Sequence, residues 1–161
     1  MHSGKILVSD TGGNYIIKLV GDVRVTLCTS FKSYIDGIFS GDPIVSVLID
    51  LTETKALDST TLGLLAKIAM HEGIAEGVKP LIITQNKSIL RLLESMGFED
   101  IFTIRKKLPS EEAELTEIPF VSGKESQTCS EVIEAHKALM SLNAENKHAF
   151  KDLVSALEQQ N

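Results

Sequence analysis

One short segment places a carboxylate beside a hydroxyl at the expected start of a helix. The nearly continuous apolar run 45–51 predicts a buried strand, a polar loop follows, and Asp58 and Ser59 then precede an apolar helical pattern. Asp58 is placed to be the N-cap, because a carboxylate there accepts hydrogen bonds from the free N–H groups of the first turn. Ser59 occupies the first helical position, where the helix end carries partial positive charge. A phosphate added to this hydroxyl could therefore be tolerated without loss of the fold.

The histidines have no spacing typical of a metal centre or a catalytic base. His71, His136 and His148 belong to no HExxH motif and to no clustered Cys/His pattern. On the same expected helix, His71 lies about 18 Å along the axis from Ser59, which is too far to serve as its base. Ser59 also lacks the GxSxG surroundings of a nucleophile elbow. We therefore expect no enzyme activity, no metal and no cofactor.

The helix that begins at Ser59 has two chemically different faces. The face expected to meet the sheet is apolar or small and consists of Leu62, Leu65, Ala66 and Ala69. The opposite, outward arc consists of Thr60, Gly63, Leu64 and Lys67. Leu64 is a large apolar side chain on that arc. Either a neighbouring loop covers it, or the arc is a protein-binding surface continuous with the Ser59 rim.

Around this helix the order of expected elements is β-β-α-β-α-β-α-β, which indicates an α/β domain over residues 1–104. Two expected strands flank a glycine-rich turn at 10–14, and a helix with apolar residues at helical spacing follows. The expected strands are 5–9, 15–21, 45–51, 81–84 and 101–104, and the expected helices are 27–39, 59–76 and 89–96.

Beyond this domain the composition changes. Residues 105–127 contain a basic trio, two prolines and several glutamates, which predicts an exposed linker. Residues 128–161 then form a helical extension, in which Thr128 and Glu131 match a capping box. Two apolar stripes follow, with a break near Asn143. These helices either pack on the preceding domain, or pair with a second copy in a homodimer, or pair with a partner's helix.

Composition excludes several classes of partner. The chain has 161 residues, 43% of them hydrophobic, and its net charge of −6 is shared equally between residues 1–104 and 105–161. No basic face is present, so nucleic acid is not expected as a direct partner. No signal peptide or long apolar run is found, so we expect no membrane contact. Cys28 and Cys129 are isolated and are interpreted as reduced thiols, which favours a cytoplasmic location.

The segment at the helix start resembles the STAS domain of bacterial anti-sigma factor antagonists (anti-anti-sigma factors). That family carries an Asp-Ser pair followed by Ser/Thr-Gly-Leu-Gly, and this chain has Asp-Ser-Thr-Thr-Leu-Gly at 58–63. Residues 20–23 (Val-Gly-Asp-Val) are similar to the family's strand-end turn, and residues 86–98 to its third helix. The resemblance covers about residues 4–104 and implies a STAS fold, a mixed sheet of about four or five strands flanked by helices.

Within the family the chain looks closest to the longer HsbA-like antagonists. Those share the stretches at 18–24 and 48–53 and have a similar C-terminal extension. Two residues depart from the family pattern. Thr61 stands where a glycine is usual after the Asp-Ser pair, which stiffens the first helical turn. Arg24 stands where many relatives have an aspartate.

The resemblance implies partner switching. The unphosphorylated antagonist binds an anti-sigma factor, or a related kinase/phosphatase regulator, and so frees a sigma factor for transcription. Phosphorylation of Ser59 by a serine kinase ends that binding, and a phosphatase restores it. In the HsbA-like branch the output concerns motility, biofilm formation and secretion. Two alternatives stay open: a nucleotide- or small-molecule-binding STAS module, and a non-switching scaffold subunit in which Ser59 is only part of the cap.

Overall fold

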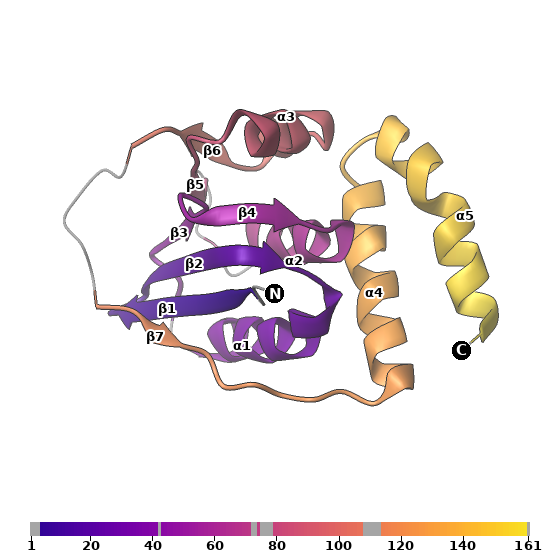
Figure 1. Cartoon of the computed structure of the whole chain (residues 1–161), viewed down its shortest axis with the longest axis horizontal. Helices are drawn as coiled ribbons and strands as arrows, with labels where there is room; N and C mark the ends of the chain where they lie inside the picture. The colour runs from indigo at the N-terminus through magenta and orange to yellow at the C-terminus, as the bar shows by residue number, and fades with distance from the viewer. Residues whose placement is uncertain (1–3, 42, 72–73, 75–78, 108–113, 161) are drawn as a thin grey trace.

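The computed structural model describes residues 4–41, 43–71, 74, 79–107 and 114–160, in which it contains one mixed sheet of seven strands and five helices (Figure 1). The strands are β1 (Lys5–Thr11), β2 (Asn14–Val23), β3 (Ser46–Asp50), β4 (Thr54–Leu57), β5 (Leu81–Ile83), β6 (Thr103–Arg105) and β7 (Thr116–Glu117). The helices are α1 (Cys28–Ser40), α2 (Ser59–Ala69), α3 (Lys87–Ser95), α4 (Glu125–Met140) and α5 (Ala144–Gln160).

The sheet is antiparallel at one side and parallel at the other. Its order is β6-β5-β3-β2-β1-β7, and β4 pairs with the far end of β2. The pairs β2–β3, β3–β5 and β5–β6 are parallel, whereas β1 pairs antiparallel with both β2 and β7. The β1–β2 hairpin turns at Gly12 and Gly13, whose φ angles of 60° and 87° are the positive values that a tight hairpin turn requires. This arrangement leads β3 and β4 directly to the start of α2.

The core lies between the sheet and the helices. Strands β2 and β3 contribute fully buried side chains such as Ile17, Leu19 and Ile49, and α2 contributes Leu65. Helices α1 and α2 contact each other, and α4 packs across both of them. Helix α5 packs on the outer side of α4, away from the sheet (Figure 1). Helices α1 and α2 therefore pack against the sheet on one side and against α4 on another.

The α/β order and the hairpin predicted from the sequence are confirmed, and two strands are additional. Both β4 and β7 were expected to be polar loop or linker, but β4 pairs with β2 and β7 pairs with β1. The connector then continues along the domain, where the Ile118 N–H donates to the Ile6 carbonyl and the Val121 N–H to the Ser30 hydroxyl. Part of the expected linker is thus attached to the sheet edge and to α1.

Two helix boundaries differ from the sequence expectations. Helix α2 ends at Ala69 rather than near residue 76, and residues 72–73 and 75–78 lie outside the described part of the chain. Helix α4 begins at Glu125, with Lys124 as N-cap, so the predicted capping box at Thr128 is wrong. The Thr128 N–H already bonds to the Lys124 carbonyl as an interior helical residue. Among the described helices, none is long and apolar enough to cross a bilayer.

Candidate functional site

Asp58 fastens the start of α2 to the loop that follows β2. As predicted, it is the N-cap, and its Oδ1 accepts from the Thr61 N–H at 2.9 Å and from the Thr61 hydroxyl at 2.9 Å. Its Oδ2 accepts from the Val25 N–H at 2.6 Å. The Thr61 side chain also donates to the Val23 carbonyl at 3.2 Å. Thr61, the departure from the family pattern, is therefore part of the cap, and both carboxylate oxygens are engaged without Ser59.

Ser59 lies half-buried beside the cap, and its hydroxyl contacts a histidine from α4. The distance from Ser59 Oγ to His136 Nε2 is 2.7 Å, and His136 Nδ1 lies 2.7 Å from the Val132 carbonyl oxygen. Because a carbonyl only accepts, Nδ1 carries the proton of the neutral ring and Nε2 is the acceptor. The Ser59 hydroxyl therefore donates to Nε2. The His136 side chain is almost fully buried, and its ring lies edge-on to the Phe150 ring of α5.

The arc of α2 predicted to face outward is covered by α4. Gly63 approaches α4 so closely that a Cβ at this position would overlap the carbonyl of Ala135. Lys67 forms an ion pair with Glu134 at 2.9 Å. The other two members of the arc, Thr60 and Leu64, are 4% and 1% exposed. The expectation that this arc faces solvent is therefore wrong: α4 packs on Gly63 and Lys67, and Leu64 borders the space between α1 and α2.

Helix α4 also contacts α1, through a buried carboxylate. The Thr29 hydroxyl donates to Glu131 Oε1 at 2.6 Å, and both residues are buried. Burial raises the pKa of the neighbouring Cys28 thiol, and the Glu131 carboxylate acts in the same direction. The thiol is thereby kept neutral, which makes it a packing residue rather than a nucleophile. Glu131, expected to be part of a helix cap, instead joins α4 to α1.

Comparison with known proteins identifies the domain. Residues 5–111 match the STAS domain family. The chain is a STAS-domain protein. Its fold is also similar to the crystal structure of an anti-sigma factor antagonist from Mycobacterium paratuberculosis, with a TM-score of 0.56 and 20% identity over 66% of this chain and 88% of that one. A comparison with curated proteins gives no match. The expected STAS fold is thus confirmed, and α4 and α5 lie outside the matched segment.

The STAS domain and the extension therefore build the site together. The domain supplies Asp58, Ser59 and the covered arc of α2, while the extension supplies Glu134, Ala135 and His136. His136 was not expected to be a ligand or base, and its contact with Ser59 was not predicted from the sequence. The one available signal was its place on the apolar stripe of the extension, which predicts burial but not the partner residue.

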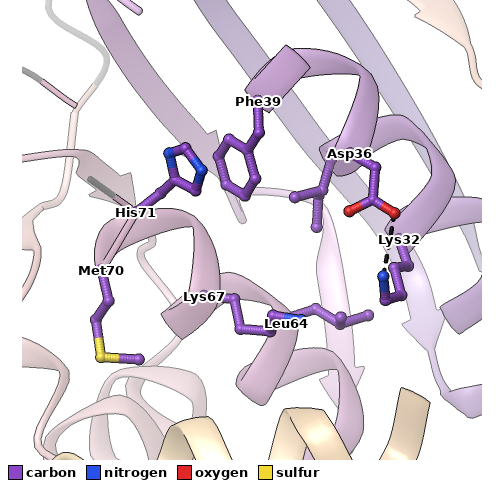
Figure 2. Close-up of a pocket in the computed structure, with 8 residues that line it drawn as sticks. Lys32, Asp36, Phe39, Leu64, Lys67, Met70 and His71 are labelled. Carbon is purple, nitrogen blue, oxygen red and sulfur yellow. Dashed lines mark hydrogen bonds and ion pairs between the residues drawn. The ribbon is translucent and has the colours of Figure 1, made fainter. Parts of the chain in front are cut away.

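Beside the covered arc, α1 and α2 enclose a pocket of about 420 Å³ (Figure 2). One wall is aromatic, where the rings of Phe39 and His71 stack with centroids 3.5 Å apart. Lys32 and Lys67 reach the rim, but Lys32 pairs with Asp36 at 3.0 Å and Lys67 pairs with Glu134. The pKa of Lys32 is raised: burial alone would lower it, but the hydrogen bond and charge of Asp36 outweigh that effect. Both cations are thus already neutralised by acids, which does not favour a phosphate ligand.

His71 and His148 lie apart in the described part of the chain. His71 lies in the pocket wall, and His148 is exposed on α5. Within the described residues, no three His, Cys, Asp or Glu side chains gather closely enough to hold a metal ion.

Proposed function

We propose that this STAS-domain protein is an anti-sigma factor antagonist that acts by partner switching, with Ser59 as the switch. The observation that carries the proposal is the independence of the cap from the serine. Asp58 accepts three hydrogen bonds at the start of α2, none of them from Ser59, so the helix stays capped when the charge of Ser59 changes. The unphosphorylated form binds the anti-sigma factor, a serine kinase adds the phosphate and a phosphatase removes it.

Electrostatics supports this direction of switching. A phosphoserine carries about −1.5 to −2 charges at neutral pH. The positive end of α2 offsets part of that charge, so the domain remains folded. A partner packed against the rim would have to desolvate the phosphate and the Asp58 carboxylate together, which is unfavourable unless it supplies arginines. We also propose that the chain belongs to the HsbA-like branch and controls motility, biofilm and secretion genes. Its proposed location is the cytoplasm.

We further propose that the Ser59–His136 pair is not a catalytic dyad. An acyl-transfer site needs free N–H donors at the position where an oxyanion develops. At the start of α2 the Thr61 N–H is already bonded to the Asp58 carboxylate. An oxyanion beside Ser59 could therefore not use the Thr61 N–H and would lie near the Asp58 carboxylate.

The test uses two full-length baits for affinity purification followed by mass spectrometry. Ser59→Ala should retain the anti-sigma factor constitutively, and Ser59→Asp should lose it while keeping the circular dichroism spectrum of the wild type. Ser88→Asp is the matched control, because Ser88 is an exposed serine in the first turn of α3. The switch is refuted if Ser59→Ala and Ser59→Asp both retain the same proteins as the wild type and the Ser88→Asp control.

Intact-protein mass spectrometry of the chain purified from cells separates a switch from a scaffold. A single added phosphate that is absent from the Ser59→Ala variant supports the switch. A chain that is never phosphorylated, under conditions where the bait partners are expressed, supports the non-switching subunit.

A homodimer through the extension is the last part of the proposal. In the structure α4 packs on its own domain, while Leu153 on α5 is 43% exposed. Light scattering of the wild type and of Leu153→Glu would show whether this side chain supports a dimer.

A further inference from the structure

The surface of α2 beside the proposed switch is occupied by this chain's own α4. Three consecutive residues of α4 each contact one member of the α2 surface: Glu134 contacts Lys67, Ala135 contacts Gly63, and His136 contacts Ser59. A partner that reaches Ser59 and this arc must take the place of α4. We infer that the α4–α5 hairpin is a displaceable cover, an autoinhibitory segment that competes with the partner for α2. This inference rests on the proposed function only in naming the anti-sigma factor as the partner that competes with α4.

The chemistry of this interface suits a contact that opens. The close approach at Gly63 is to the Ala135 backbone, so little apolar surface is exposed at that point when the helices separate. The Lys67–Glu134 pair is partly exposed and regains its hydration in the open form. Ser59 and His136 likewise exchange one hydrogen bond for bonds to water.

The apolar part of the interface limits how far the cover opens by itself. Ala135 and Leu139 are fully buried and belong to the main core cluster, and Glu131 is buried against Thr29. Asn146, at the start of α5, donates to the Met96 carbonyl at 2.8 Å and so attaches the hairpin to the end of α3. The closed form is therefore the resting state, and a partner must supply the free energy that displaces α4.

The connection to the domain allows such a movement. The chain is attached to β1 through β7, and to α1 through the bond between Val121 and Ser30. Residues 122–124, between that point and α4, are exposed, although Gly123 lies close to the Thr29 side chain of α1. Displacement of α4 and α5 therefore requires no break in the sheet, and the STAS domain can stay folded while its α2 surface becomes free.

Hydrogen exchange on the full-length chain tests the cover without any partner. We expect amides of α4 to exchange faster than those of β2 and β3, because they open without global unfolding. His136→Ala should accelerate exchange in α4 about fivefold by removing the bond to Ser59 and the packing of the ring against Phe150. Ala135→Leu should accelerate it tenfold or more by overfilling the fully buried space around residue 135. The matched control is His148→Ala, an exposed histidine of the same hairpin, which should change nothing.

Two results would overturn the cover. One is α4 exchanging at the rate of β2 and β3 in the wild type, which would make it an integral part of the domain. The other is hydrogen exchange in α4 of the His136→Ala variant that is no faster than in the wild type. If Ala135→Leu also accelerates hydrogen exchange in β2 and β3, that variant has lost its fold. The His136→Ala variant then decides whether α4 is a displaceable cover.

The anti-sigma factor recovered with the Ser59→Ala bait, once purified, provides the second measurement. Its binding should slow exchange in α2, speed exchange in α4, and be about tenfold tighter for Ala135→Leu than for the wild type. If that protein binds and Ser59→Asp abolishes binding, but α4 stays protected in the complex, the proposed function stands and the cover is refuted. If no bait retains a partner, the proposed function fails, and exchange in the free chain still decides whether α4 opens.

Discussion

The two faces of α2 are both buried, yet they are built from different chemistry. Toward the sheet, Leu62, Leu65 and Ala66 are at most 1% exposed and belong to the continuous apolar core. Toward α4, polar and backbone contacts at Ser59, Gly63 and Lys67 stand beside the buried apolar residues Ala135 and Leu139 of α4. Apolar burial is lost in proportion to area when an interface opens, whereas polar groups bond to water instead. Burial alone therefore does not separate a permanent interface from a reversible one.

The largest effect is expected on the sheet side. Leu65→Ala removes a fully buried side chain at the centre of the core and should lower the free energy of unfolding by about 2–5 kcal/mol. Urea unfolding followed by circular dichroism measures it. The variant should lose protection in the sheet and in α4 together. A loss restricted to α4 would show that the two faces of α2 do not differ as argued.

A matched pair of glycines addresses the other face. Gly63→Ala places a methyl group against the Ala135 backbone and should lower stability by about 1–3 kcal/mol, with fast exchange confined to α4. Gly37→Ala is the control, because Gly37 lies within α1 with open space around its Cβ position. It should raise stability by about 0.5–1 kcal/mol, since alanine is the better helix former. Equal effects of the two substitutions would contradict the close approach at Gly63.

The contact of α4 with α1 should have a somewhat smaller effect. Thr29→Val keeps the shape of the side chain but removes the hydroxyl that donates to the buried Glu131 carboxylate. We expect a loss of about 1.5 kcal/mol, typical of a hydrogen bond to a charged group. In the double variant with Glu131→Gln the further effect of Thr29→Val should shrink. Additive losses would mean that the two side chains do not interact.

On α1, among the described residues, the Tyr34 hydroxyl is a polar group that is buried without a hydrogen bond to compensate. In the described part of the chain, the Tyr34 hydroxyl has no hydrogen-bond partner, and burial, with smaller contributions from Asp10 and Tyr15, raises its pKa to about 12. Tyrosine in an unfolded chain has a pKa of about 10. The folded state holds this proton more tightly, so the corresponding stability is fully present below about pH 10 and is lost as the pH rises through about 12.

Tyr34→Phe should therefore be as stable as the wild type at pH 8, or more stable by about 0.5–1 kcal/mol. Its stability should also fall less than that of the wild type between pH 10 and pH 12. Urea unfolding at pH 8, 10 and 11.5 measures both differences. An identical fall in the two proteins would show that Tyr34 titrates as it does in the unfolded chain.

The predictability of the two faces from the sequence also differs. The sheet face of α2 follows from helical periodicity, and the Asp58 cap from local residue preferences, because both are properties of one segment. The α4 face depends on a contact between residues 59 and 136, and no local pattern specifies such a pairing. Gly63 was predicted only to lie on the outward arc, and nothing in the sequence indicated that the Ala135 backbone packs against it. Short polar strands such as β4 and β7 were missed for the same reason, since their pairing is decided by tertiary position.

The smallest effect is expected for the ion pair at the edge of the covered arc. Lys67 and Glu134 are 30% and 52% exposed, and pairs of this kind contribute about 0.2–1 kcal/mol. Lys67→Ala, Glu134→Ala and the double variant form a cycle whose coupling energy should be about 0.5 kcal/mol at low salt and should fall toward zero at high ionic strength.

The Lys137–Glu158 pair, which joins α4 to α5 instead, is the matched control. Its cycle should show a similar coupling in urea unfolding but leave hydrogen exchange in α2 unchanged, because breaking it does not loosen α4 from α2. A coupling at Lys67–Glu134 of several kcal/mol would mean that charge, rather than close packing at Gly63, holds α4 on α2.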